Sequence, residues 1–229
     1  MPESSIDPRW PKLLSLSVHE FRTPLTVVAG YVRMLLKERA GPLNDQQRKL
    51  LEETEKSCAR LSTLLAEVSD LANLESGATS VNRQAADLRA ILRTAIDQLP
   101  PLHDREVPVK LQTGQGPAMI QADVPKLTLG ITSVLAALRR ELVTSDELLV
   151  REDRVGDGAP THRILIGDRE TIDTLEQNSS NLPVFDEWRG GCGMALAVAR
   201  RVFNAHGGGI WSPPDGRKAG ALIVIPAAR

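Results

Sequence analysis

Apolar residues recur between Leu14 and Leu35 at a spacing that strongly constrains the fold. Steps of four and three residues alternate over the whole stretch, which is the a/d pattern of helices packed in a bundle. The sequence therefore predicts a helix over about residues 11–39. Its apolar seam consists of Leu14, Val18, Phe21, Leu25, Val28, Val32 and Leu35.

A second helix is predicted to follow after a short break at residues 40–43. Asn44 and Gln47 form a capping-box-like pair, so this helix is expected to begin near Asp45 and to end near residue 75. It has a heptad seam of its own. A hairpin of two helices has too little core alone, so we expect two copies to pair as a four-helix bundle, which makes a homodimer. A hairpin packed only on the chain's own second domain remains the alternative.

His19 follows the seam residue Val18, so its imidazole is expected beside the bundle, within reach of water. Glu20 can accept the proton of one ring nitrogen and leave the other as a nucleophile. Thr23, one turn later, offers a hydroxyl that could hold a water. Pro24 lacks an amide hydrogen and is predicted to kink the helix. Taken alone, His19 fits either a phosphorylatable residue or an ordinary surface histidine.

The seven residues His-Glu-Phe-Arg-Thr-Pro-Leu at 19–25 resemble the phosphoacceptor box of bacterial two-component sensor histidine kinases. The resemblance implies that His19 is the phosphorylated residue and that Glu20 and Thr23 act with it in catalysis. Arg22 and Pro24 are then expected to orient the site or to contact a docking partner. That partner is expected to be the receiver domain of a response regulator.

From residue 78 the pattern changes to the shorter elements of an α/β sandwich, so we predict two domains, 1–77 and 78–229. Asp87 is a predicted helix cap, and the segment 169–190 is expected to be rich in loops. The order of elements resembles the ATP-binding domain of the same kinases, of the GHKL type, and the expected fold class is α+β. Helices are predicted at 88–99, 124–142 and 193–205, and strands at 107–111, 118–122, 147–154, 162–166, near 210 and at 221–225.

In that family, a helix supplies an asparagine that holds magnesium against the phosphates. Counting from Asp123, the two asparagine positions of the pattern fall on Ser133 and Ala137. Alanine has no oxygen ligand for magnesium, so no metal site is predicted. Glu141 as a substitute ligand stays open. Arg140 stands where the family often has a phosphate-contacting cation.

The family's Asp-x-Gly-x-Gly motif, whose aspartate reads the adenine amino group, corresponds here to residues 168–172. Asp168 is present, but Glu170 and Ile172 replace the two glycines, so ATP is expected to fit poorly. The stretch 190–196 resembles the glycine-rich phosphate loop, with Gly191 and Gly193 as weak candidates for nucleotide binding. His206, which is followed by glycines, is predicted to be a turn residue.

Composition excludes some functions. A net charge of −1 gives no reason to expect nucleic acid or a membrane surface as a partner. The two cysteines, Cys58 and Cys192, form no metal or redox spacing, so a reduced cytoplasmic location is the default. No apolar run approaches the roughly 20 residues that span a bilayer, and the first residues do not resemble a signal peptide.

Three functions remain. In the first, a family member with a degenerate ATP site acts as a phosphotransferase or pseudokinase, and His19 exchanges a phosphoryl group with a response-regulator aspartate. This reaction needs no bound ATP, so no cofactor is firmly expected. In the second, the chain is an ATP-dependent sensor histidine kinase with a divergent site, using ATP and magnesium. In the third, it is a dimeric interaction platform without catalysis.

Overall fold

The computed structural model describes residues 10–75, 81–102, 105–142, 145–156, 159–189, 194–216 and 218–228. The chain divides into two compact units, Met1–Thr79 and Ser80–Arg229. Each unit has its own elements and its own core. Among the described residues, no helix is long and apolar enough to cross a membrane.

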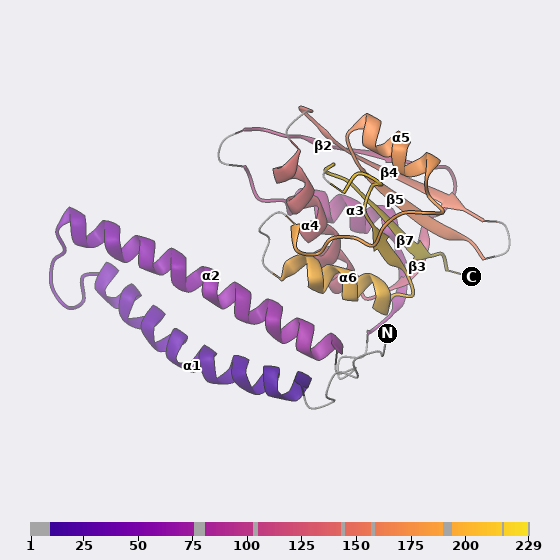
Figure 1. Ribbon diagram of the computed structural model, residues 1–229. Helices are drawn as coiled ribbons and strands as arrows, with labels where there is room; N and C mark the ends of the chain where they lie inside the picture. Colours follow the sequence, from indigo (N-terminus) through magenta and orange to yellow (C-terminus); the bar gives the residue numbers. More distant parts are fainter. Residues whose placement is uncertain are drawn as a thin grey trace. The chain divides into compact units, whose positions relative to one another are not determined.

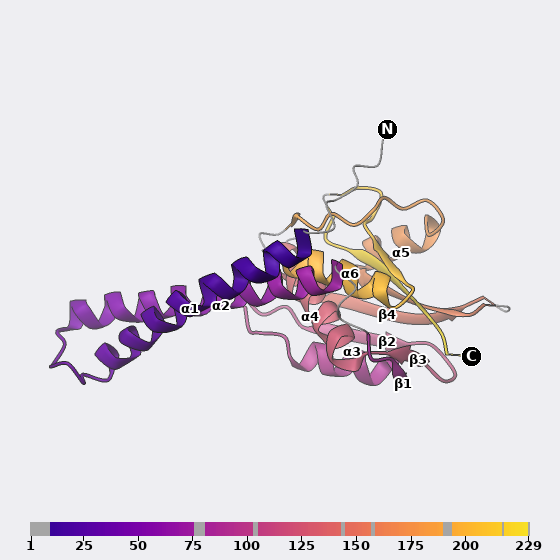
Figure 2. The same cartoon turned by 90° about the horizontal axis from the view of Figure 1, so that it is seen from below.

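The first unit is a helical hairpin in which α1 (Trp10–Leu36) and α2 (Asp45–Glu75) lie side by side in both views (Figures 1 and 2). The predicted capping box at the start of α2 is confirmed. The amide of Asn44 donates to Gln47 Oε1 at 3.0 Å, and the amide of Gln47 donates to Asn44 Oδ1 at 2.8 Å. These reciprocal bonds satisfy two amides that the first turn leaves without a partner.

Some residues of the apolar seam of α1 are buried in the hairpin, and others are exposed. Val18 and Val32 are buried within the described chain. In contrast, Phe21 is 64% exposed and Val28 is 48% exposed. The hairpin therefore leaves about half of its seam uncovered, although burying a large apolar side chain is worth roughly 2 kcal/mol.

The first helix ends three residues earlier than predicted, in a left-handed turn. The amide of Arg39 donates to the Met34 carbonyl, and the amide of Glu38 donates to the Leu35 carbonyl. This is a Schellman motif, whose left-handed position is usually a glycine. Here that position is Glu38, with φ of 55°, and its carboxylate pairs with Arg48 at 2.5 Å.

Replacing Glu38 should show the energetic cost of this turn. Glu38→Ala and Glu38→Gly both remove the ion pair with Arg48, but only glycine adopts the left-handed conformation without strain. We expect Glu38→Gly to be more stable than Glu38→Ala by about 1 kcal/mol. Urea unfolding followed by helical circular dichroism, at one protein concentration, measures the difference. Equal stability of the two variants would contradict the assignment of strain to residue 38.

The second unit is built on a five-stranded mixed sheet with the order β2-β4-β5-β7-β6. β2 and β4 are parallel, and the remaining neighbours are antiparallel. The short strands β1 and β3 form a separate antiparallel pair beside α3 (Figure 2). The strands are β1 (Gln84–Asp87), β2 (Val109–Thr113), β3 (Met119–Ala122), β4 (Leu148–Val155), β5 (Thr161–Gly167), β6 (Gly209–Trp211) and β7 (Ala221–Pro226).

Three helices, α3 (Leu88–Asp97), α4 (Val124–Glu141) and α6 (Ala195–Ala205), pack together and share the core of this unit with the strands. The predicted cap of α3 is confirmed, because the side chain of Asp87 accepts a hydrogen bond from the amide of Arg89. The expected α+β architecture is therefore present. Strand β1 was not predicted, and the other strands and helices shift by only a few residues.

The expectation of a loop-rich segment at 169–190 is wrong in its first half. Arg169–Gln177 forms helix α5, which lies apart from the other three helices (Figure 1). Ile172 and Leu175 of α5 pack in one cluster with Leu149, Leu165 and Leu222 of the sheet. Because side chains alternate between the faces of a strand, these leucines belong to the opposite face from Val150, Ile164 and Ile223, so α5 covers the second face of the sheet.

Candidate functional site

His19 lies on an exposed flank of α1, as its spacing predicted. Its side chain is 76% exposed, and that of Glu20 is 73% exposed. The distance from His19 Nδ1 to Glu20 Oε1 is 3.6 Å, just beyond a hydrogen bond. A small rotation of either side chain would let Nδ1–H donate to the carboxylate, which leaves Nε2 as the free nucleophile.

The neighbours of His19 are held by backbone contacts of the same helix. The hydroxyl of Thr23 donates to the carbonyl of His19 at 3.4 Å and keeps its lone pairs for a water. Arg22 is exposed, and its carbonyl accepts from the hydroxyl of Thr26 at 2.8 Å. α1 continues through Pro24, which has no amide hydrogen to donate to the Glu20 carbonyl. The predicted kink stays a prediction.

Neither asparagine position of α4 carries an amide oxygen that could hold a metal. Ala137 is completely buried. The hydroxyl of Ser133 donates to the carbonyl of Leu129 at 2.9 Å. The possible substitute, Glu141, forms an ion pair with Arg189 at 2.6 Å. In the described part of the chain, no group of three or more His, Cys, Asp and Glu side chains is arranged to hold a metal ion.

Arg189 is a residue that the sequence did not single out. Besides Glu141, its guanidinium donates to the carbonyl of Lys218 at 3.0 Å and lies 5.8 Å from the ring centre of Phe185. Phe185 is buried. Arg189 therefore ties the end of α4 to the segment before α6 and to the turn before β7. Its carboxylate partner is distant in sequence, so no local pattern could have shown this contact.

Asp168 caps helix α5. Its Oδ1 accepts a hydrogen bond from the amide of Thr171 at 2.8 Å, as the first residue before a helix typically does. Thr171 is buried between two glycines, because a Cβ at Gly167 or Gly220 would lie 2.9 or 2.4 Å from its side chain. Ile172 follows and is completely buried. The motif predicted to read adenine thus forms the start of a packed helix.

The remaining nucleotide-site candidates lie on other elements. Arg140 is an exposed residue near the end of α4, and its carbonyl accepts from Arg105 at 2.7 Å. Gly191 and Gly193 lie outside the described residues. The helix that follows them, α6, begins at Ala195 without a side-chain cap on Met194.

His206 connects the end of α6 to the start of α4, as a structural residue. Its Nδ1 is 2.7 Å from the carbonyl of Val202, and its Nε2 accepts from the amide of Asp123 at 3.0 Å. The imidazole is therefore neutral, with its proton on Nδ1. Burial lowers the pKa of His206 below its ordinary value of 6.5.

Comparison with known proteins identifies the relatives of this chain. Residues 12–77 match the family model "His Kinase A (phospho-acceptor) domain", which covers α1, α2 and His19. The circadian input-output histidine kinase CikA of Thermosynechococcus vestitus is 26% identical over 93% of the chain. Residues 12–77 therefore form a phosphoacceptor domain of the histidine kinase type, and the chain as a whole is similar to histidine kinases. CikA of Synechococcus elongatus is 24% identical over 87% of this chain.

The similarity to CikA covers only part of those proteins, because this chain spans 30% and 27% of their lengths. Two solved structures share its fold. Full-length ShkA, in complex with AMPPNP, has a TM-score of 0.67 at 21% identity over 95% of this chain and 45% of ShkA. Acinetobacter baumannii histidine kinase AdeS has a TM-score of 0.54 at 17% identity over 92% of this chain and 98% of that one.

Substitutions at Asp168 test its role as a helix cap. Asp168→Ala should lower the free energy of unfolding of the second unit by about 1 kcal/mol, whereas Asp168→Asn should keep most of the stability, because asparagine also caps helices well. Urea unfolding followed by tryptophan fluorescence is suitable, since Trp211 packs against the cluster that contains Ile172. Unchanged stability of Asp168→Ala would contradict the capping role.

The stability of the second unit should fall as the pH drops below about 6.5. In this range the unfolded chain protonates His206 and the folded chain does not, because its pKa is lowered. Thermal unfolding at pH 7.5 and 5.5 should show a midpoint lower by a few degrees at pH 5.5. His206→Asn, which does not titrate, should be less stable at pH 7.5 and lose less on acidification. An equal loss in both proteins would show that other groups cause the pH dependence.

Proposed function

We propose that this chain is a phosphotransferase or pseudokinase whose His19 exchanges a phosphoryl group with an aspartate of a response regulator. The proposal rests on a contrast between the two units of the chain, in the state of their functional residues. The phosphoacceptor box is complete and exposed on α1. Asp168 and Ala137, which stand at the nucleotide positions of the second unit, are used for capping and packing.

The reaction that we propose needs only His19 and its neighbours. Nε2 of His19 attacks the phosphorus of the aspartyl phosphate in line with the bond to the carboxylate oxygen. An N–P bond forms, the P–O bond breaks, and the electron pair leaves with the aspartate. The imidazole becomes positively charged, and Glu20, 3.6 Å from Nδ1, stabilises that charge and can accept the proton. Thr23 would position a water for dephosphorylation.

The exposed seam supports a homodimer. Phe21, Val28 and Leu35 are spaced by seven residues along α1 and remain exposed in the single chain. On α2, Leu61 is also exposed. A second hairpin would cover these side chains in a four-helix bundle, which is the arrangement that their spacing predicts. The receiver domain would then dock on the hairpin below His19.

The residues present on α4 do not fit a magnesium ion. Magnesium requires oxygen ligands in a near-octahedral shell. Ala137 offers a buried methyl group. Glu141 binds Arg189 through Oε2, so its Oε1 is a buried oxygen without a described hydrogen-bond partner, and one such oxygen beside a guanidinium does not make that shell. We therefore assign no step of the reaction to magnesium or to ATP bound by this chain.

The second candidate is an ATP-dependent histidine kinase with a divergent site. It is favoured by one observation, the likeness of fold to ShkA, whose solved structure is a complex with AMPPNP. Under this proposal, Asp168 would contact adenine through its second carboxylate oxygen, while the first continues to cap α5.

A transfer assay with two phosphoryl donors distinguishes the candidates. The full chain is incubated with labelled ATP and magnesium, and in parallel with a labelled phospho-receiver domain. We expect acid-labile label on the chain from the receiver only. His19→Gln should abolish the transfer, and Glu20→Gln should slow it by about 10²-fold or more.

Label from ATP that is lost in His19→Gln would favour the kinase instead. No label from either donor would favour an interaction platform. Arg39→Gln, an exposed position in the turn after α1, serves as a control that should leave transfer unchanged.

A further inference from the structure

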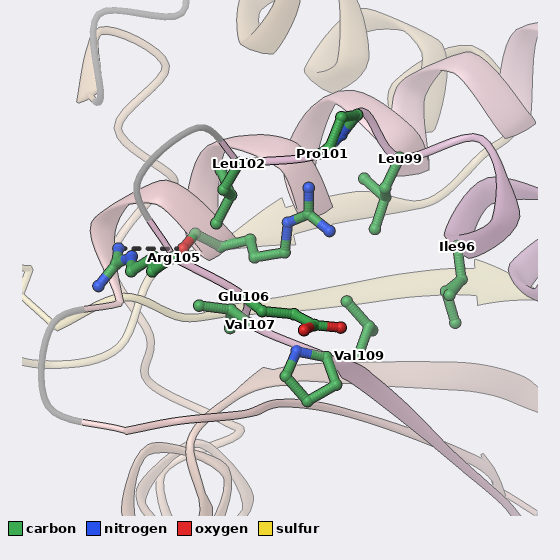
Figure 3. Close-up of a pocket in the computed structure, with 10 residues that line it drawn as sticks. Ile96, Leu99, Pro101, Leu102, Arg105, Glu106, Val107 and Val109 are labelled. Carbon is green, nitrogen blue, oxygen red and sulfur yellow. Dashed lines mark hydrogen bonds between the residues drawn. The ribbon is translucent and has the colours of Figure 1, made fainter.

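A cavity of about 590 Å³ lies in the second unit, among the end of α3, the start of β2 and the C-terminal part of α4. In Figure 3, Leu99 and Leu102 lie along one wall, and Val107 and Val109 lie along the opposite wall. The lining thus combines apolar side chains with the charged groups of Arg105, Glu106 and Arg139. Cavities of this size are typical of binding sites for small organic molecules.

Arg139 supplies an unusual charge to this cavity. Its Nε is buried and has no hydrogen-bond partner in the described part of the chain. Its guanidinium donates to the carbonyl of Pro100, which is a neutral acceptor. Burial lowers the pKa of Arg139, and no described carboxylate forms an ion pair with it. The guanidinium is partly exposed, but its Nε is removed from water without a partner, and an anion at the cavity would compensate the cost of that burial.

The other charged groups of the lining leave an excess of positive charge. Arg105 lines the same cavity, and its Nη2 donates to the carbonyls of Arg140 and Arg139 at 2.7 and 3.4 Å. Glu106, the only described acid in the lining, is exposed. An adjacent cavity of about 520 Å³ shares Arg105 and Arg139 and adds Arg140 to its lining.

We propose that this cavity binds a small organic anion that has one carboxylate and an apolar body. The carboxylate would accept hydrogen bonds from Arg139, whose planar guanidinium matches its geometry. The apolar body would lie between Leu102 and Val107. Arg139 follows the buried Ala137 by two residues, which places the two side chains on opposite sides of α4. The site is therefore distinct from the nucleotide-type positions, and it does not depend on the proposed phosphotransfer.

Calorimetric titration of the full chain with octanoate tests the charge and the apolar body together. Octylammonium has the same chain length with the opposite charge. We expect octanoate to bind with a Kd below about 1 mM, and octylammonium to bind at least tenfold more weakly. Arg139→Met should weaken octanoate binding about tenfold, because it removes a charged hydrogen-bond donor and keeps the apolar stem. Arg154→Met, on an exposed part of β4, is the matched control and should not change the affinity.

NMR spectra of methyl-labelled protein show where the ligand binds. Octanoate should shift the methyl signals of Leu99, Leu102 and Val107, and should leave Leu61 on the exposed face of the hairpin unchanged. Should Arg139→Met fail to fold, Leu99→Trp provides a second test, because it fills the cavity and leaves Arg139 in place. The proposal is overturned if octanoate and octylammonium bind equally, if neither variant weakens binding, if only Leu61 shifts, or if no binding occurs up to about 10 mM.

Discussion

The hydrogen bond from the amide of Thr171 to Asp168 is the interaction on which the architecture of the second unit depends. It starts α5 at the residue that, in related kinases, is expected to face adenine. Thr171 then fits between Gly167 and Gly220, where a Cβ on either glycine would clash with its side chain. Ile172 and Leu175 follow and cover the second face of the sheet. Under the proposed function, this short segment forms a packed helix where the family resemblance implies an adenine site.

This exchange explains why the loss of the nucleotide-type residues is tolerated. A packed residue such as Ile172 gains roughly 2 kcal/mol from burial, and the cap contributes about 1 kcal/mol more. Glycines at positions 170 and 172 would lower the helix propensity of α5 and would remove the buried side chain of Ile172. The same logic applies to α4, where Ala137 packs in the core and Glu141 is held by Arg189. The hairpin shows the opposite tendency, because it keeps its reactive histidine exposed and half of its apolar seam uncovered.

The sequence predicted the local features well. The seam of α1, the capping box at Asn44 and the cap at Asp87 depend on neighbours within four residues, and each is present. Helix α5 was missed because Arg169–Gln177 is mostly polar and has only two large apolar residues, Ile172 and Leu175, one turn apart. Asp168 was interpreted only as an adenine-reading residue, so its capping of α5 was not predicted. Contacts such as that of Arg189 with Glu141 join segments that are distant in sequence, so no periodic pattern in the sequence predicts them.

The central claim is that the second unit no longer binds magnesium and ATP. Calorimetric titration of the full chain with AMPPNP, with and without magnesium, tests this most directly. The account predicts no saturable binding below about 1 mM under either condition. Micromolar binding that requires magnesium would contradict it, because Ala137 has no oxygen and the single unpartnered oxygen of Glu141 does not make an octahedral shell.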